Sequence, residues 1–117
     1  MDHQTEIEFI SIQKKLKEQF PGDGNMDINA ILMIIGLQES GRGNRGYTKD
    51  DKMNLLHVAI CTLLSQYGFY EYTHDDEEGW PHFKLISPLP HITVTEQEEL
   101  LRTAVVSYFK ENGFIAG

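Results

Sequence analysis

The stretch that decides the fold is Phe69-Tyr70-Glu71-Tyr72-Thr73-His74-Asp75-Asp76-Glu77-Glu78-Gly79-Trp80-Pro81-His82-Phe83-Lys84-Leu85-Ile86. Its two ends, 69–74 and 82–86, are rich in aromatic and β-branched residues, which favour strands. The residues between them are acidic and contain Gly79 and Pro81, which is typical of a turn. The stretch therefore predicts a β-hairpin. Its loop is longer than two residues, so the strand register stays open.

Helical spacing dominates the chain before the hairpin. Residues 4–20 place apolar side chains one helical turn apart, at Phe9, Ile12, Leu16 and Phe20, with Ile7 and Ile10 widening the stripe. Residues 21–25 contain proline and glycine and end this helix. Asp27 is the expected N-cap of a second helix of about 12 residues. Residues 28–37 are apolar on almost every side, which predicts a central helix, although a buried strand over 31–35 is an alternative.

A third helix is expected after a glycine-rich loop at residues 39–47. Thr48-Lys49-Asp50-Asp51 has the pattern of a helix start with an N-terminal cap. We expect the core-facing arc to carry the apolar residues Met53, Leu56, Ile60, Leu63, Leu64 and Tyr67. The far side then carries Asn54, Cys61, Thr62 and Ser65. Gly68 is expected to end the helix in a left-handed conformation.

The last helix is expected to begin at the capping box Thr95-Glu96-Gln97-Glu98. One half of it is apolar, through Leu100, Leu101, Ala104, Val105, Tyr108 and Phe109. Gly113 followed by Phe114 is typical of a glycine cap with a hydrophobic contact.

Composition places the chain among small, acidic globular proteins. It has 117 residues, 10 Lys and Arg against 18 Asp and Glu, and 40% hydrophobic residues. This size predicts a single domain over residues 1–117. No apolar run is long enough for a transmembrane span, and the amino terminus is acidic where a secretory signal would be basic. The single Cys fits a reducing compartment, so we expect a cytoplasmic protein.

The expected fold class is mainly α (α+β), in the order α-α-α-β-β-α. Three helices followed by a hairpin resemble the order of winged-helix folds, in which the third helix contacts DNA. The basic candidates for that function are Arg42, Arg45, Lys49 and Lys52. Residues 53–117 carry three basic against nine acidic residues, and the wing would place four acidic residues beside phosphate. A nucleic-acid partner is therefore the alternative rather than the main hypothesis.

Two groups of residues suggest other chemistry. The acidic loop with His74, His82 and His91 could bind a metal ion, but its spacing matches neither an EF-hand loop nor a helix-borne His-Glu-x-x-His pair, so we expect no metal and no cofactor. His57 and Cys61 lie four residues apart and could form a nucleophile with its base or two metal ligands, but a third group is missing. The simpler interpretation is a boundary histidine and a partly buried cysteine.

Asn54, His57, Cys61 and Ser65 also form a polar strip that could face a partner or a shallow pocket. The apolar second helix needs cover on all sides, which a second copy of the chain could supply. We therefore expect a protein partner or a homodimer.

Gly79-Trp80-Pro81-His82-Phe83 is the most distinctive short segment. Trp is enriched at interface hot spots, and with Tyr70, Tyr72 and Phe83 it could form an aromatic platform. The alternative, which we favour, is that Trp80 folds back onto the helices and anchors the hairpin. The candidate interaction residues are thus Trp80, Pro81, His82, Phe83, Tyr72, Asn54, His57 and Cys61.

Residues 27–109 resemble a family of small uncharacterised bacterial proteins. The resemblance rests on four segments: Asp27-Ile28-Asn29-Ala30-Ile31-Leu32, Tyr47-Thr48-Lys49-Asp50-Asp51-Lys52, Leu56-His57-Val58-Ala59 and Gly79-Trp80-Pro81-His82-Phe83-Lys84-Leu85. It implies no activity, cofactor or catalytic residue. It implies only that the helix after Thr48 and the hairpin at Trp80 are family features.

These observations predict a non-enzymatic protein-interaction or scaffold module that self-associates. The first alternative is a winged-helix-like regulator associated with nucleic acid. The second, with less support, is a small metal-binding protein or an enzyme that uses His57 and Cys61.

Overall fold

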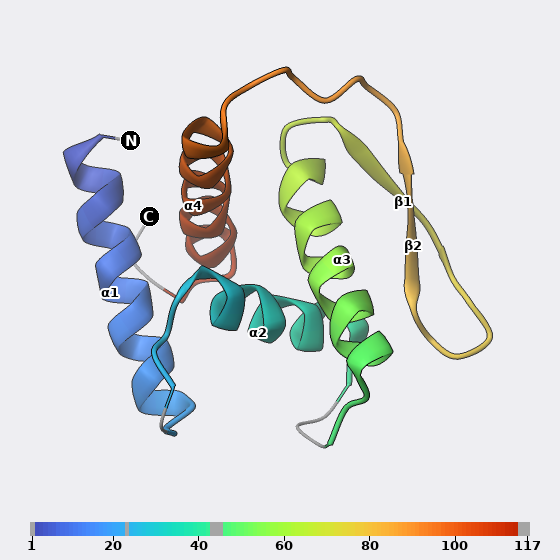
Figure 1. Cartoon of the computed structure of the whole chain (residues 1–117), viewed down its shortest axis with the longest axis horizontal. Coiled ribbons are helices and arrows are strands. Elements are labelled where there is room, and N and C mark those ends of the chain that lie inside the picture. Colours follow the sequence, from blue (N-terminus) through green and yellow to red (C-terminus); the bar gives the residue numbers. More distant parts are fainter. Residues whose placement is uncertain (1, 23, 43–45, 115–117) are drawn as a thin grey trace. The chain divides into compact units, whose positions relative to one another are not determined.

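The computed structural model describes residues 2–22, 24–42 and 46–114. It contains four helices and a two-stranded antiparallel sheet in the order α-α-α-β-β-α, which confirms the predicted fold class (Figure 1). The contacts divide the chain into two compact units, described here in turn. One comprises the described residues up to 28 and from 91 onward, and the other comprises the described residues between 29 and 90.

The first unit is a pair of helices, α1 (His3–Gln19) and α4 (Val94–Glu111), which lie side by side (Figure 1). Helix α1 buries Phe9, Ile12 and Leu16, as its spacing predicts. The two helices are also joined by an ion pair in which Lys110 Nζ lies 2.6 Å from Glu8 Oε2. This unit is held by one apolar stripe on each helix, with few polar contacts between them.

Two expectations for these helices are wrong in detail. Phe20, Ile7 and Ile10 are exposed, because helix α1 ends before Phe20 and its buried stripe is only one residue wide. Helix α4 is capped by Thr93 and Glu96, not by Thr95 and Glu98. The sequence contains both Thr-x-x-Glu matches, and the earlier one lets the helix begin two residues sooner.

The second unit contains α2 (Ile28–Ser40), whose first residue belongs to the other unit, and α3 (Lys49–Ser65). Helix α2 begins directly after Asp27, as expected, and it leaves no large hydrophobic side chain exposed. A Cβ on Gly36 would lie 2.3 Å from the carbonyl oxygen of Leu55, so only glycine allows this close approach of the two helices.

Helix α3 has the predicted capping box, formed by Thr48 and Asp51. The predicted apolar arc is only partly right: Leu63 and Leu64 are buried, but Met53 is 61% exposed and Tyr67 is also exposed. Of the predicted far side only Cys61 is buried, whereas Leu55 and Val58, which lie outside the predicted arc, are buried as well. Apolar residues occur around most of this helix. The hairpin packs on α3 and covers a side that the predicted apolar arc does not include.

The hairpin consists of β1 (Tyr70–Asp75) and β2 (Pro81–Leu85). Tyr72 lies opposite Phe83, but the next paired residues are His74 and His82, so Thr73 forms a bulge. Before the hairpin, Gly68 has a φ of 80°, and at the end of α4 Gly113 has a φ of 72°, both as the sequence predicts.

Among residues 2–22, 24–42 and 46–114, no helix is both long enough and apolar enough to cross a lipid bilayer.

Candidate functional site

A pocket of about 160 Å³ lies between α3 and the hairpin. Six of the eight candidate interaction residues line it, namely Asn54, His57, Trp80, Pro81, His82 and Phe83, together with Val58 and Asp76. Of the remaining candidates, Cys61 is buried within the unit, and Tyr72 lines a different pocket on the same unit. The structure therefore brings most of the predicted residues together, although Trp80 contributes little exposed surface.

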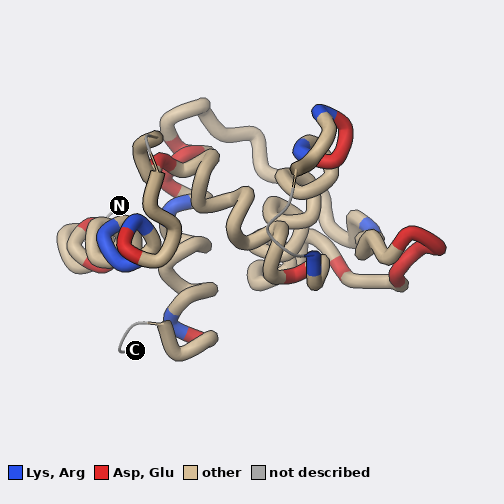
Figure 2. The backbone as a smooth tube through the Cα atoms, turned by 90° about the horizontal axis from the view of Figure 1, so that it is seen from below, with Lys and Arg blue, Asp and Glu red and all other residues tan. Residues whose placement is uncertain are grey.

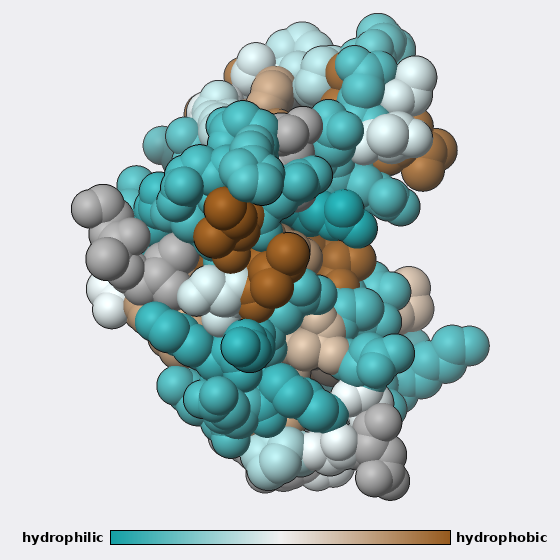
Figure 3. Space-filling model, turned by 90° about the vertical axis from the view of Figure 1, so that its left-hand side faces the viewer, coloured by the Kyte–Doolittle hydropathy of each residue, from teal (hydrophilic) through white to brown (hydrophobic). Residues whose placement is uncertain are grey.

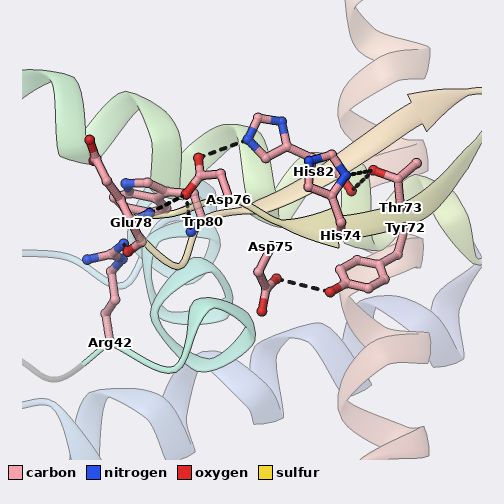
Figure 4. A network of polar contacts seen from close by, with 9 residues as sticks. All are labelled: Arg42, Tyr72, Thr73, His74, Asp75, Asp76, Glu78, Trp80 and His82. Atoms are coloured by element: carbon pink, nitrogen blue, oxygen red, sulfur yellow. Dashed lines mark hydrogen bonds and ion pairs between the residues drawn. The ribbon is translucent and has the colours of Figure 1, made fainter.

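The hairpin tip is organised by Asp76 (Figure 4). Its Oδ1 accepts hydrogen bonds from the backbone N–H groups of Glu78 (2.9 Å) and Trp80 (3.0 Å), and its Oδ2 lies 2.9 Å from Nε2 of His82. The bond to His82, followed by the bonds from the backbone, lowers the pKa of Asp76 below its ordinary value. The Asp76 carboxylate thus accepts hydrogen bonds from two backbone N–H groups of the loop and fixes the orientation of His82.

Two histidines stack beside this network. The rings of His74 and His82 are parallel within 3°, with centroids 5.0 Å apart. The bulge at Thr73 produces this pairing, since regular register would place Thr73 opposite His82. Thr73 Oγ1 lies 2.9 Å from His74 Nδ1 and donates to the His82 carbonyl at 3.1 Å.

These histidines and the acidic loop do not form a metal centre. Within the described part of the chain, no three His, Cys, Asp or Glu side chains are placed to hold a metal ion. Asp76 uses its oxygens for the loop and for His82. The set proposed from the sequence, with His91 as a further member, is not brought together.

Trp80 anchors the hairpin. Its side chain is only 7% exposed and packs with the buried residues Leu55 and Val58 of α3. The guanidinium carbon of Arg42 lies 3.7 Å from the centre of the Trp80 ring, and Arg42 Nη2 donates to the Glu78 carbonyl at 2.5 Å. An aromatic platform that includes Trp80 is therefore wrong, because helix α3 and Arg42 cover its ring.

His57 and Cys61 make a contact, with Sγ 3.5 Å from Nε2. Cys61 is 1% exposed, and burial raises the pKa of its thiol to about 11. A cysteine nucleophile needs the opposite shift and access to substrate. The geometry gives no support to a Cys/His active site.

The three candidate nucleic-acid residues that the structure describes do not form one basic surface. Arg42 is engaged with Trp80 and Glu78, and Arg45 lies outside the described residues. Lys49 and Lys52 are exposed on the first turns of α3, next to Asp50 and Asp51. Figure 2 shows the hairpin tip as a continuous acidic segment.

Comparisons of this chain with protein-family models, curated proteins and solved structures find no match. The resemblance to a family of small bacterial proteins and the winged-helix likeness therefore stay predictions.

Exposed hydrophobic side chains occur at several places on the surface. On the side drawn in Figure 3, brown side chains emerge between hydrophilic ones. Exposed hydrophobic residues of the second unit include Leu85 (49% exposed), Ile86 (50%) and Tyr72 (52%) of the hairpin segment. Helix α2, from which we expected an interface with a second copy, contributes none, so the surface available to a partner lies elsewhere.

Sequence reasoning did not predict the roles of Asp76 and Arg42 in holding the hairpin tip. Asp76 had a usable signal, since an aspartate three residues before a glycine in a tight loop commonly bonds to backbone N–H groups. Arg42 had none, because its partner is 38 residues away along the chain.

Proposed function

We propose that this chain is a non-enzymatic protein-interaction module whose contact element is the open end of the hairpin. The observation that carries the proposal is the outer edge of β2, where two half-exposed aliphatic side chains lie at the end of the strand: Leu85, its last residue, and Ile86, the residue after it. Among the described residues, β2 pairs only with β1, so its other edge is unpaired.

The backbone groups of this edge follow from the register. The Ile86 N–H donates to the Phe69 carbonyl at 2.9 Å, and hydrogen-bonded pairs alternate with non-bonded pairs in an antiparallel ladder. Leu85 and Phe83 therefore belong to non-bonded pairs, and their N–H and C=O groups point away from β1. A strand from a partner protein can use those groups and cover Leu85 at the same time.

The other edge is less suited to a partner strand. The bulge at Thr73 interrupts β1, and bulges are a common protection of edge strands. The proline of strand β2, Pro81, is its first residue, so it leaves the rest of that edge able to pair. An added strand is therefore expected along Phe83, Lys84 and Leu85.

The surroundings are consistent with this function. The polar groups of the tip bond to one another, and the Cys61 thiol is buried, so neither offers a reactive group. A free, buried cysteine supports the cytoplasmic location that we include in the proposal.

A photo-crosslinking residue at Ile86, introduced into the full chain in cells, tests the proposal. We expect a defined adduct with a protein partner or with a second copy. The matched control is the same residue at Val94, which is 71% exposed and apolar but lies on helix α4, not at a strand edge. Adducts in equal yield from both positions, or none from Ile86, would contradict the proposal.

Sedimentation velocity over a wide concentration range then separates the two occupants. A second copy requires concentration-dependent association that Leu85→Lys abolishes and Val94→Lys does not. If the chain stays monomeric while the Ile86 adduct persists, the occupant is a different protein.

A further inference from the structure

The two stacked histidines near the hairpin tip are held by different partners. His82 lies against the carboxylate of Asp76, and His74 lies against the hydroxyl of Thr73 (Figure 4). Both side chains are exposed, so water reaches their rings. The partners decide which nitrogen of each neutral ring carries the hydrogen and which keeps a lone pair.

The neutral form of His82 carries its hydrogen on Nε2. This nitrogen lies 2.9 Å from Asp76 Oδ2, and an ionised carboxylate can only accept a hydrogen bond. The bonds from His82 and then from the backbone keep the pKa of Asp76 below its ordinary value of 3.8, so Asp76 is ionised at neutral pH. The lone pair of neutral His82 is therefore on Nδ1, which bonds to no described residue.

The neutral form of His74 carries its hydrogen on the other nitrogen, Nδ1. The Thr73 hydroxyl has a single hydrogen, which it donates to the His82 carbonyl at 3.1 Å. The 2.9 Å contact between Thr73 Oγ1 and His74 Nδ1 is then a hydrogen bond only if Nδ1 is the donor. The lone pair of neutral His74 is therefore on Nε2, which also bonds to no described residue.

These two lone pairs can each take up a proton, but they cannot share a metal ion. A histidine binds a metal ion close to the plane of its ring, at about 2.0 to 2.1 Å from the nitrogen. The rings of His74 and His82 are stacked and parallel within 3°. An ion in the plane of one ring therefore lies outside the plane of the other, and proton uptake is the chemistry that the arrangement allows.

Within the hairpin, one carboxylate faces the stack. Asp76 bonds to His82, so it compensates one positive charge. The next pair along the strands is Glu71 and Lys84, whose opposite charges offset each other. Asp75 bonds to a tyrosine hydroxyl on the opposite side of the hairpin (Figure 4). The remaining acidic residues of the loop, which bond to neither ring through their carboxylates, are Glu77 and Glu78.

Helix α3, which packs on the hairpin, adds no negative charge to the stack. His57 lines the pocket that also contains His82, and it is the only titratable residue of α3 among the lining residues. Its neighbour Cys61 stays neutral, because burial raises the pKa of the thiol to about 11. Protonation of His57 therefore adds to the positive charge beside the stack.

We propose that the stack makes the hairpin sensitive to pH, closed while at most one ring is protonated and open when both are. Histidine changes its charge between about pH 5 and pH 8. Two positive charges on rings whose centres lie 5.0 Å apart repel each other, and Asp76 compensates only one of them. His74 is the ring that leaves, since a neutral hydroxyl holds it, whereas a carboxylate holds His82.

The direction of the effect on stability follows from the unfolded state. In the unfolded chain the two rings are apart, so this repulsion is absent and the second proton binds more readily. The unfolded state then binds more protons than the folded state, and the folded hairpin loses stability as the pH falls through the histidine range.

The variant His74→Asn tests the inference by urea denaturation at about pH 7.5 and about pH 5.5. The Asn Nδ2 replaces His74 Nδ1 as donor, and the bond between Asp76 and His82 stays in place. Between these pH values, we expect the unfolding equilibrium constant of the parent to rise about three- to tenfold more than that of the variant.

The matched control is His91→Asn, the same substitution at an exposed histidine outside the hairpin. It should keep the full pH dependence of the parent. Equal pH dependence of the parent and His74→Asn, or equal loss of it in both variants, would overturn the inference.

Nitrogen NMR of the labelled full chain tests the same arrangement without a substitution. At about pH 7.5 we expect the Nδ1–H form of His74 and the Nε2–H form of His82. During acid titration the two rings should take up their protons in separate steps. The Nε2–H form at His74, or a single shared step, would overturn the inference.

This inference is independent of the contact proposed at the open end of the hairpin. A missing adduct at Ile86 would leave the pH dependence of the stack standing. A hairpin whose stability does not respond to His74→Asn would leave the unpaired edge of β2 available to a partner.

Discussion

The two ends of the hairpin use the same two strands in opposite ways. At the tip, Asp76 satisfies the loop, and Trp80 is packed between α3 and Arg42. At the open end, Leu85 and Ile86 are half exposed, and the outer edge of β2 has no partner strand among the described residues. The tip carries the residues that most resemble a binding site by type, and the open end carries exposed aliphatic side chains beside a strand edge that no described strand pairs with.

This difference separates residues that build the fold from residues that are free to bind. Tryptophan and histidine are enriched at functional sites, but Trp80 and His82 already have partners within the chain. Leucine and isoleucine are common in cores, but at the open end of the hairpin Leu85 and Ile86 remain at the surface. Whether a side chain already has a partner within the chain, rather than its residue type, indicates the surface that another protein would use.

The largest expected effect comes from removing the anchor of the tip. Trp80→Ala should lower the free energy of unfolding by about 3 to 5 kcal/mol, because a large buried side chain is lost and leaves a cavity. Urea denaturation followed by circular dichroism measures this change. Tyr72→Ala, at an exposed aromatic residue of the same hairpin, is the control and should cost far less. Similar losses from both variants would contradict the contrast between anchor and surface.

A smaller effect is expected from the cation above the ring. Arg42→Lys keeps the charge but loses the planar stacking on Trp80 and the bond to the Glu78 carbonyl, which should cost about 1 to 2 kcal/mol. Trp80 is the only tryptophan, so its fluorescence reports the tip directly. We expect a red-shifted emission and easier quenching by acrylamide. An unchanged spectrum would mean that Arg42 does not cover the ring in solution.

The carboxylate of the tip should show a smaller effect that depends on pH. The folded-state pKa of Asp76 lies below its ordinary value of 3.8, so its ionised form stabilises the fold above that pH. This stabilisation is lost as the pH falls through the lowered pKa. Asp76→Asn should therefore destabilise the protein at neutral pH and match the parent in strong acid. Glu77→Gln, one residue away, should show no such convergence.

Local sequence patterns predicted those elements whose stabilising contacts join residues close in sequence. The Thr48–Asp51 capping box and the hairpin depend on residues close in sequence, so both could be predicted. The start of α4 was misplaced because two capping matches overlap, at Thr93 and Thr95. The predicted order of the elements is correct because each element has a sequence signal of its own.

Contacts between distant segments could not be predicted in the same way. Apolar residues occur around most of α3, so the positions of α2 and of the hairpin decide that Leu55 is buried and Met53 is exposed. Likewise, nothing near Arg42 indicates a ring 38 residues later. The pocket with Asn54, His57 and His82 was partly predicted, because one polar strip and one hairpin segment supply it.

The smallest effect on stability is expected at the open end, where Leu85→Lys should change the free energy of unfolding by less than about 1 kcal/mol. Leu85 is already half exposed, and the aliphatic part of lysine can cover the same surface while its charge stays in water. Urea denaturation of this variant beside Trp80→Ala compares the two ends of one hairpin under one condition. If Leu85→Lys cost as much as Trp80→Ala, the open end would be part of the core, and its loss of crosslinking could no longer be attributed to a partner.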